Sequence, residues 1–340
     1  MIGFNNIFKA ELYKIAKGKS LLKIFIAVAV IFIVSSLIFY FLYNLIGTAS
    51  FLPQDEVTEE TVEAARVEVE NATQYEETLN APQKMADTTL YSAKATYTLY
   101  KYMSDNNLSF ASARMFGSTT ALTANAYILF MIQVMSIAVV VFATVSIVRS
   151  FAGERSNGTL KMQLLKPISK EAIVVGKMLA VWVVSIGIFI FTLLLSAIVG
   201  ICAFKVDAKT VLIVLNASSV IETSAANEIF IYFLYYVTHI SQFIVFGMFM
   251  SNLIKKNEGA AIALTMVILF IGTTIERVLG YIFIGYIGLN LNIDWINSLT
   301  LSGPTLNYMN LYSQLGISIA WFVGMVAYSI FAFKKADIHT

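Results

Sequence analysis

The sequence is poor in the residue types from which most catalytic and metal sites are built. It has one cysteine, Cys202, and two histidines among 340 residues, and 13% of its residues are charged, against about 25% in an average soluble domain. A lone cysteine excludes a disulfide within the chain and a cysteine-rich zinc or iron–sulfur site. Two histidines are too few for a histidine-based zinc site. We therefore expect no catalytic residue and no metal site.

A phosphate-binding loop is missing as well. The pattern G-x-x-x-x-G-K-[ST] does not occur, and the glycine pair in "GERSNGT" (153–159) lacks the lysine that would reach the phosphates of a nucleotide. That segment also follows an apolar run instead of a strand. We expect that the chain binds no cofactor, is not an enzyme by itself and has no nucleic-acid partner.

Apolar residues, by contrast, make up 58% of the chain, and the mean hydropathy is +0.75. A helix needs about 20 apolar residues to cross a bilayer, and it satisfies its own backbone hydrogen bonds there. We predict an all-α, polytopic membrane protein with transmembrane helices at 21–47, 121–148, 172–204, 229–254, 259–275 and 313–333. The first run is too long for a signal-peptide core and lacks a cleavage pattern after it, so we expect it to remain as an anchor.

Basic and acidic residues divide between two sets of connecting segments. Residues 1–23, 149–177, 255–258 and 334–340 hold 15 of the 23 basic and 5 of the 21 acidic residues, whereas 48–120, 205–228 and 276–312 hold 8 basic and 16 acidic residues. Lys and Arg concentrate on the cytoplasmic side of membrane proteins. We therefore expect a multi-pass plasma-membrane protein with both termini, the loop 149–171, the turn 255–258 and the tail 334–340 in the cytoplasm.

Two segments outside the predicted spans show helical periodicity. In 1–20 the apolar residues Phe4, Ile7, Phe8, Leu12 and Ile15 share one helix face, which predicts an amphipathic connecting helix along the headgroups. The alternative is a basic tail that only sets the topology. In 48–120, two apolar stripes separated by a proline predict a small helical extracellular domain. Its acidity would either attract cationic cargo or keep the surface soluble.

The remaining outer segments differ in polarity. Residues 205–228 are predicted to form an outer loop. Residues 276–312 are apolar for a loop and rich in glycine, so we expect them to re-enter the outer leaflet. There they would line an exit path or supply interfacial aromatic residues.

His239 and Gln242 lie near the middle of the fourth predicted span, three residues apart on one helix face. Polar residues inside a span usually face the bundle interior or a water-filled cavity. The pair would act either as hydrogen-bonding glue between helices or as part of a cargo path. None of the six spans carries a centrally placed Asp or Glu, which disfavours an ion-driven carrier.

The segment 153–170, "GERSNGTLKMQLLKPISK", is predicted to turn and then form a short amphipathic helix that ends at a proline. Physical chemistry alone leaves open whether this basic segment only fixes the topology. The wider sequence "FAGERSNGTLKMQLLKPISKEAIVVGKML" resembles the signature region of ABC-2 type permeases, the membrane subunits of a class of ABC transporters. The residues that match are Glu154, Gly158, Thr159, Leu160, Leu164, Leu165, Pro167 and Ser169.

This resemblance implies a function and partners. In that family the loop after the second span and the N-terminal helix press on a separate cytoplasmic ABC ATPase subunit, which binds ATP and Mg. The eight matching residues would then be ATPase-coupling residues, and six spans without an ATPase imply a second permease copy, as a homodimer or a heteromeric equivalent.

The large outer domain resembles that of Gram-positive exporters. We therefore expect a Gram-positive source and, besides contact with membrane lipid, an amphipathic peptide cargo, a toxin or antimicrobial peptide resembling the phenol-soluble modulins. The alternatives are ABC export of a drug, lipid or sodium. Two other classes also stay open, an ion-driven secondary carrier and a membrane sensor.

Overall fold

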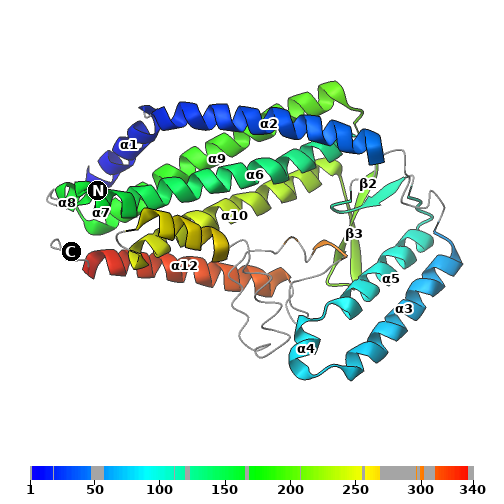
Figure 1. Cartoon of the computed structure of the whole chain (residues 1–340). Coiled ribbons are helices and arrows are strands. Elements are labelled where there is room, and N and C mark those ends of the chain that lie inside the picture. Colours follow the sequence, from blue (N-terminus) through cyan, green and yellow to red (C-terminus); the bar gives the residue numbers. More distant parts are fainter. Residues whose placement is uncertain are drawn as a thin grey trace.

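A computed structural model describes residues 2–17, 19–46, 57–110, 112–118, 123–164, 168–206, 208–254, 257–268, 296, 299–301 and 311–335. The structure is mostly helical, with long helices running side by side and a smaller unit at one end (Figure 1). We call this end of the bundle the sheet end, and the opposite end, where α1 lies, the α1 end.

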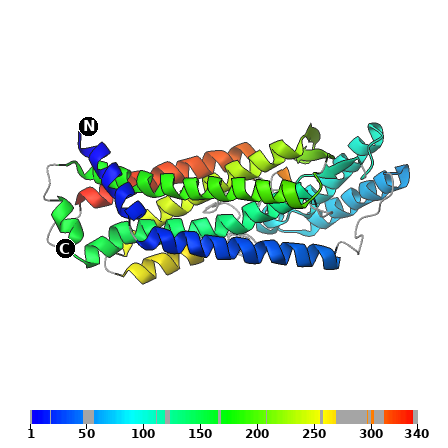
Figure 2. The same ribbon diagram turned by 90° about the horizontal axis from the view of Figure 1, so that it is seen from above.

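The bundle is built around α6. Its helices are α2 (Lys19–Ile46), α6 (Ala124–Val148), α9 (Lys170–Ala203), α10 (Ala225–Leu253) and α12 (Leu311–Lys335). Helix α6 packs against α2, α9 and α10 and is buried along most of its length, whereas α2 covers the bundle from outside (Figure 2). A displacement of α6 would therefore change its contacts with three neighbouring helices.

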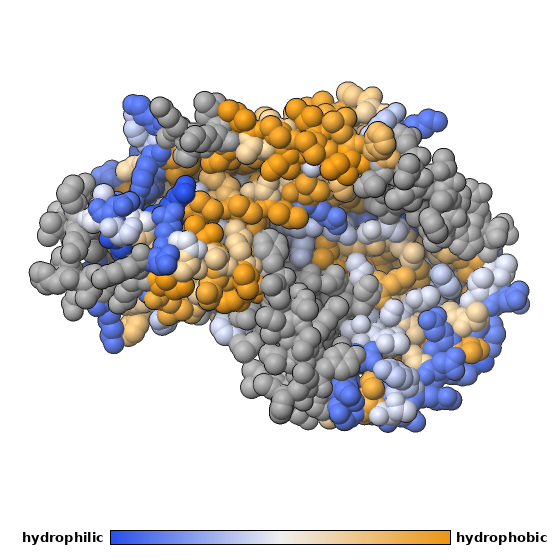
Figure 3. Space-filling view, viewed as in Figure 1, coloured by the Kyte–Doolittle hydropathy of each residue, from blue (hydrophilic) through white to orange (hydrophobic). Residues whose placement is uncertain are grey.

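Four helices are long and apolar enough to cross a membrane, within the parts of the chain that are described. They are Ile24–Phe41, Ala124–Ser156, Lys170–Ala203 and Ala225–Leu253, and a shorter apolar helix covers Glu258–Ile268. Large apolar side chains such as Leu37, Phe41 and Ile198 are exposed on them, and apolar residues form broad patches on the face of the bundle shown in Figure 3. The predicted helical membrane protein is thereby confirmed in this coarser form.

Of the last two predicted spans, the fifth is described only in part and the sixth in full. Of 259–275, only the part up to Ile268 is described, and 313–333 coincides with α12. The predicted re-entrant segment 276–312 lies outside the described residues except for Ile296, residues 299–301 and the first residues of α12.

Helix α1 (Ile2–Lys17) packs against α9 at the α1 end. It turns Ile7 and Ile15 toward the core and exposes Lys9 and Lys17. The close approach depends on Gly176 of α9, where a Cβ atom would lie 3.0 Å from Cγ2 of Ile7. A larger residue at this position would push the two helices apart.

The unit at the sheet end contains three helices among the described residues. Helices α3 (Glu59–Thr78) and α5 (Thr89–Asp105) pack against each other, and the short α4 (Ala81–Ala86) joins them. Asn80 and Gln83 cap α4 reciprocally, and a proline is tolerated in its first turn because the backbone N–H groups there have no partner within the helix. Hydrophilic residues cover much of this unit (Figure 3).

A three-stranded sheet joins this unit to the bundle, and the all-α prediction did not include it. Strand β2 (Thr210–Leu215) lies between β1 (Ala113–Met115), which is parallel to it, and β3 (Ser219–Thr223), which is antiparallel. Residues 205–228, predicted as a loop, therefore contain a hairpin and the first turn of α10.

Successive side chains of β2 enter two different cores. Val211 and Ile213 join the core of the bundle, whereas Leu212 and Val214 pack with Leu99 and Met103 of α5. Because both faces are buried, the strand is a continuous apolar run, "TVLIVL", instead of an alternating one. Such a short run shows no strand periodicity in the sequence.

Candidate functional site

Helix α6 does not end where the second predicted span ends. It continues through a π-helical turn, η1 (Arg149–Gly153), into α7 (Glu154–Ser156). The chain then turns and forms α8 (Thr159–Leu164). Single π-helical turns inside α-helices are frequent at functional sites. The start of the predicted loop 149–171 is thus an extension of the central helix, buried from Ser150 to Glu154.

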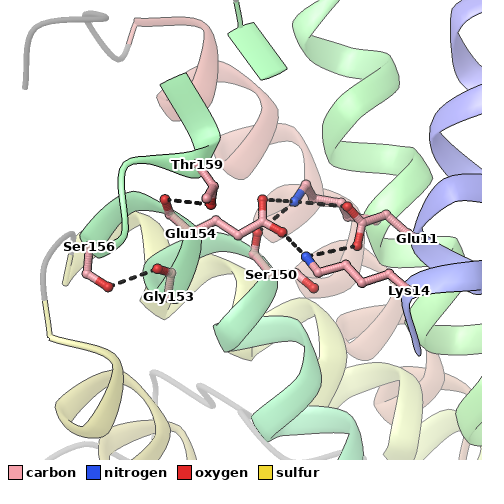
Figure 4. A network of polar contacts seen from close by, with 8 residues as sticks. Glu11, Lys14, Ser150, Gly153, Glu154, Ser156 and Thr159 are labelled. Carbon is pink, nitrogen blue, oxygen red and sulfur yellow. Dashed lines mark hydrogen bonds and ion pairs between the residues drawn. The ribbon is translucent and has the colours of Figure 1, made fainter. Parts of the chain in front are cut away.

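Glu154 points into the protein and joins two other helices (Figure 4). Its Oε2 lies 2.5 Å from Nζ of Lys177 on α9, and its Oε1 accepts a hydrogen bond from Lys14 on α1. Glu11 of α1 completes the group, with its carboxylate oxygens 3.3 Å from Nζ of Lys177 and 3.7 Å from Nζ of Lys14. We call Glu11, Lys14, Glu154 and Lys177 the four-charge cluster.

The four-charge cluster is electrically balanced, with two carboxylates and two ammonium groups. Lys177 is fully buried, and its ammonium also donates to the backbone carbonyl of Ser150 at 2.9 Å. A buried charge costs several kcal/mol unless it is paired and hydrogen-bonded. The cluster meets that requirement, and so it holds α1, α7 and α9 in one arrangement.

Lys14 lies at the edge of the cluster and is exposed to solvent. Burial lowers the pKa of Lys14, but the hydrogen bond to Glu154 and the charge of Glu11 together outweigh burial and raise it above the ordinary value of 10.5. A raised pKa of a basic group means that its contribution to stability is present below the ordinary value and is lost as the pH rises through the folded-state value. Lys14 is therefore charged at neutral pH.

The turn between α7 and α8 presents the exposed surface of this region. Gly158 has φ of +71° and open space around it, a conformation that strongly favours glycine. Ser156 and Thr159 are exposed, and their hydroxyls donate to the backbone carbonyls of Gly153 and Glu154 at 2.9 and 3.3 Å. These bonds tie the turn to the end of the extended α6.

The other predicted coupling residues have different environments. Leu160 is 3% exposed and belongs to the bundle core, so it is not a surface anchor for a partner. The hydroxyl of Ser169 accepts a hydrogen bond from the backbone N–H of Ala172 at 3.2 Å and caps α9. Leu164 ends α8, with no described side chain, and Leu165 and Pro167 lie outside the described residues.

Further polar contacts connect the α1 end to the later helices. Arg155 of α7 donates to the backbone carbonyl of Ser251 at 3.0 Å and to Oδ1 of Asn252 at 2.8 Å, both on α10. Lys334 of α12 pairs with Glu171 of α9. The extended end of α6 is thus linked by side chains to α1, α9 and α10, although these contacts were not predicted from the sequence.

His239 and Gln242 lie in the middle of α10 and are surrounded by aromatic rings and apolar residues. The ring of His239 stacks on Tyr235 at 5.8 Å and meets Phe243 edge-on at 5.0 Å. Gln242 is 7% exposed. Neither residue lines the cavity of about 970 Å³ at the sheet end or the cavity of about 1190 Å³ at the α1 end. Their roles as helix glue or cargo path stay predictions.

The described residues contain no group of three or more His, Cys, Asp or Glu side chains that could hold a metal ion. The four-charge cluster at the α1 end instead suits a mechanical joint between helices, because its charged side chains pair with one another across α1, α7 and α9.

Comparison with known proteins identifies the family. Residues 5–338 match a family described as ABC-2 family transporter protein, and a comparison with curated proteins gives no significant match. The matched region covers nearly the whole chain, including most of α1, the four-charge cluster and α12. The chain therefore belongs to the ABC-2 transporter family, and it is a membrane permease of an ABC transporter.

Proposed function

We propose that the chain is the permease subunit of an ATP-driven exporter, and that the turn after α7, with α1, receives force from a separate ABC ATPase. Association with an ABC ATPase is implied by the family. The observation that carries the proposal is the four-charge cluster, which joins α1, the extended end of α6 and α9 at the α1 end.

The coupling would work through the continuous helix from α6 to α7. A partner that pushes on the exposed turn at 156–158 displaces α7, and the displacement passes directly into α6. The ion pairs of Glu154 carry it to α1 and α9, and Arg155 carries it to α10. Glu154 would thus transmit force inside the permease without touching the ATPase.

The α1 end would face the cytoplasm. Lys9, Lys17, Arg149 and Lys335 are exposed there, together with Lys14 and Lys334, whereas the exposed surface of α3 at the sheet end is rich in glutamate. Basic residues favour the cytoplasmic side. The proposal includes six spans, with 259–275 and α12 as the last two, and an outer position for α3, α5 and the sheet.

An amphipathic peptide is the proposed cargo, and a second permease copy would complete the transport path. The acidic α3 at the proposed outer face is compatible with a cationic peptide, and the aromatic residues of α10 are compatible with its apolar side. Export of a drug, lipid or sodium is the alternative. An ion-driven carrier is disfavoured because the buried carboxylates Glu11, Glu154 and Glu228 are each paired with a basic side chain.

The test is reconstitution of the tagged full chain with the ABC ATPase that copurifies from its native membranes. In liposomes, we expect ATP hydrolysis to rise when a cationic amphipathic peptide is added and the peptide to move only with ATP. A catalytically dead ATPase should abolish movement. Movement that persists with the dead ATPase and follows an ion gradient would contradict the proposal and favour a carrier.

A further inference from the structure

A long groove opens between α1, α2 and α6 at the α1 end. Its volume is about 1190 Å³. One wall is apolar and contains Ile24, Val28 and Ile31 of α2 with Val134, Ile137 and Val141 of α6. Its other end carries charged side chains, among them Lys14, Arg149 and Glu258. The groove is therefore amphipathic along its length.

The apolar wall of the groove has the length of the acyl region of one leaflet. Along α6 this wall extends from Val134 to Val145, which at 1.5 Å per residue is about 16 Å. Half of the hydrocarbon core of a bilayer is about 15 Å thick. A lipid whose headgroup lies at the level of α1 would thus place its acyl chains along the apolar wall.

The most exposed charges at the polar end are positive. The side chains of Lys14 and Arg149 are 56% and 65% exposed, whereas those of Glu11 and Glu154 are 7% and 8% exposed. Glu258 is 32% exposed and pairs with Arg149, with 2.7 Å between Nε and Oε1. The buried carboxylates already bind Lys177, so an arriving anion meets the two cations first.

We propose that this groove binds one anionic phospholipid from the leaflet at the α1 end, with its phosphate at Lys14 and Arg149 and its acyl chains between α2 and α6. Because Lys14 also belongs to the four-charge cluster, the lipid contacts the joint between α1, α7 and α9. The proposal requires a membrane protein, which the family provides, and it does not depend on the cargo.

Lipid retention by the purified full chain tests the proposal. After exchange into detergent, we incubate the protein with phosphatidylglycerol or phosphatidylcholine of the same acyl chains and measure the bound lipid by native mass spectrometry. We expect the unaltered chain to retain phosphatidylglycerol in preference to phosphatidylcholine. Ala138→Trp fills the groove and should weaken retention at least about tenfold, roughly the loss of one main contact.

Matched variants separate the groove from general lipid contact. Ile33→Trp adds the same bulk on an exposed position of α2 that does not line the groove, and it should retain lipid normally. Arg149→Gln should reduce the preference for phosphatidylglycerol about fivefold, as expected for one cation near a headgroup. Lys335→Gln, at the same end of the bundle, should leave the preference unchanged.

Several results would overturn the proposal. Equal retention of the two lipids by the unaltered chain would do so, as would normal retention by Ala138→Trp. If Ala138→Trp instead abolishes self-association without affecting bound lipid, the groove is an interface between two copies of the chain. If Ala138→Trp fails to fold, Arg149→Gln still tests the proposal, because Arg149 is a surface residue and its replacement should leave the fold intact. An unchanged preference for phosphatidylglycerol in Arg149→Gln would then contradict the proposal.

Discussion

At the scale of single residues, Glu154 is the residue whose role changes most between sequence and structure. Its position in the family-like segment suggested direct contact with an ATPase. In the structure it is 6% exposed and paired with Lys14 and Lys177. A buried carboxylate between two ammonium groups holds neighbouring helices together, so a substitution there should affect both stability and coupling.

We expect Glu154→Gln to lower the thermal unfolding temperature in detergent. It leaves Lys177 buried with a weaker partner, and breaking a buried ion pair costs about 3–5 kcal/mol. The double variant Glu154→Gln with Lys177→Met should recover much of that loss, because no unpaired ammonium remains buried.

Glu171→Gln is the control for this prediction. Its pair with Lys334 is exposed, and such pairs contribute at most about 1 kcal/mol. Equal effects of Glu154→Gln and Glu171→Gln would refute the role of the cluster.

Two glycines with positive φ offer a second test at this scale. Alanine at either position adopts a left-handed conformation at a cost of about 1–2 kcal/mol. At Gly117 (φ +77°) a Cβ would also lie 2.7 Å from the hydroxyl oxygen of Tyr232, whose ring stacks on Phe116 at 5.1 Å.

Gly117→Ala should therefore lower the unfolding temperature more than Gly158→Ala, which has open space around it. Instead, Gly158→Ala should mainly distort the turn between α7 and α8 and reduce peptide-stimulated ATP hydrolysis. Differential scanning fluorimetry and a coupled ATPase assay give the two readouts. A larger thermal effect at Gly158 would contradict the assignment of open space.

At the scale of elements, the contact between α1 and α9 decides whether α1 moves with the bundle. Gly176 allows this contact, and Gly187 lies on the same helix with open space around it. Leucine at 176 must displace Ile7, whereas leucine at 187 needs no rearrangement. The two positions form a matched pair.

We expect Gly176→Leu to release α1 while the bundle stays folded. Hydrogen exchange in 2–17 should accelerate, trypsin should cleave sooner after Lys9 and Lys17, and ATP-driven transport should fall. Gly187→Leu should behave like the unaltered chain in all three measurements. If exchange in α1 is unchanged in Gly176→Leu, then the glycine contact does not hold this helix.

The sheet is stabilised by contacts with the elements on both of its faces. Strand β2 buries one face in the bundle and the other against α5. At the same place Arg114 of β1 pairs with Glu228 of α10, both buried, and the N–H of Gly117 donates to Glu228 at 2.8 Å. These contacts attach the unit at the sheet end firmly to α10, so this unit is not a freely hinged domain.

At the scale of the whole molecule, the orientation in the membrane remains a prediction, and the lone cysteine makes it measurable. Cys202 is exposed near the sheet end of α9. In the Cys202→Ser background, Ser219→Cys in β3 and Ser156→Cys in the turn after α7 place a thiol at exposed sites of the two ends.

We expect a membrane-impermeant maleimide to label Ser219→Cys in intact cells and Ser156→Cys only after permeabilisation. Basic residues at the α1 end underlie this expectation. Cys202→Ser alone is the unlabelled control. The reverse labelling pattern would place the coupling turn outside the cell and would rule out contact with a cytoplasmic ATPase.

Much of the architecture could be predicted from local sequence. Long apolar runs predicted α2, α6, α9 and α10, because burial in a bilayer depends on the hydropathy of each segment by itself. Their ends were less predictable. Arg149 and Ser150 look like loop residues, yet they continue α6 as a π-helical turn because Phe151 and Ala152 are covered by the bundle.

Membrane insertion, the family and the separation of charge along the chain could all be predicted from the sequence, since each depends on the composition or the motif of a short segment. That Glu154 faces inward, and which charges neutralise it, became clear from the packing of the helices. Lys14 and Glu154 are 140 residues apart in the chain, and a pair so distant forms only when helices pack. The same holds for β2, whose two buried faces exist because the bundle and α5 close over it.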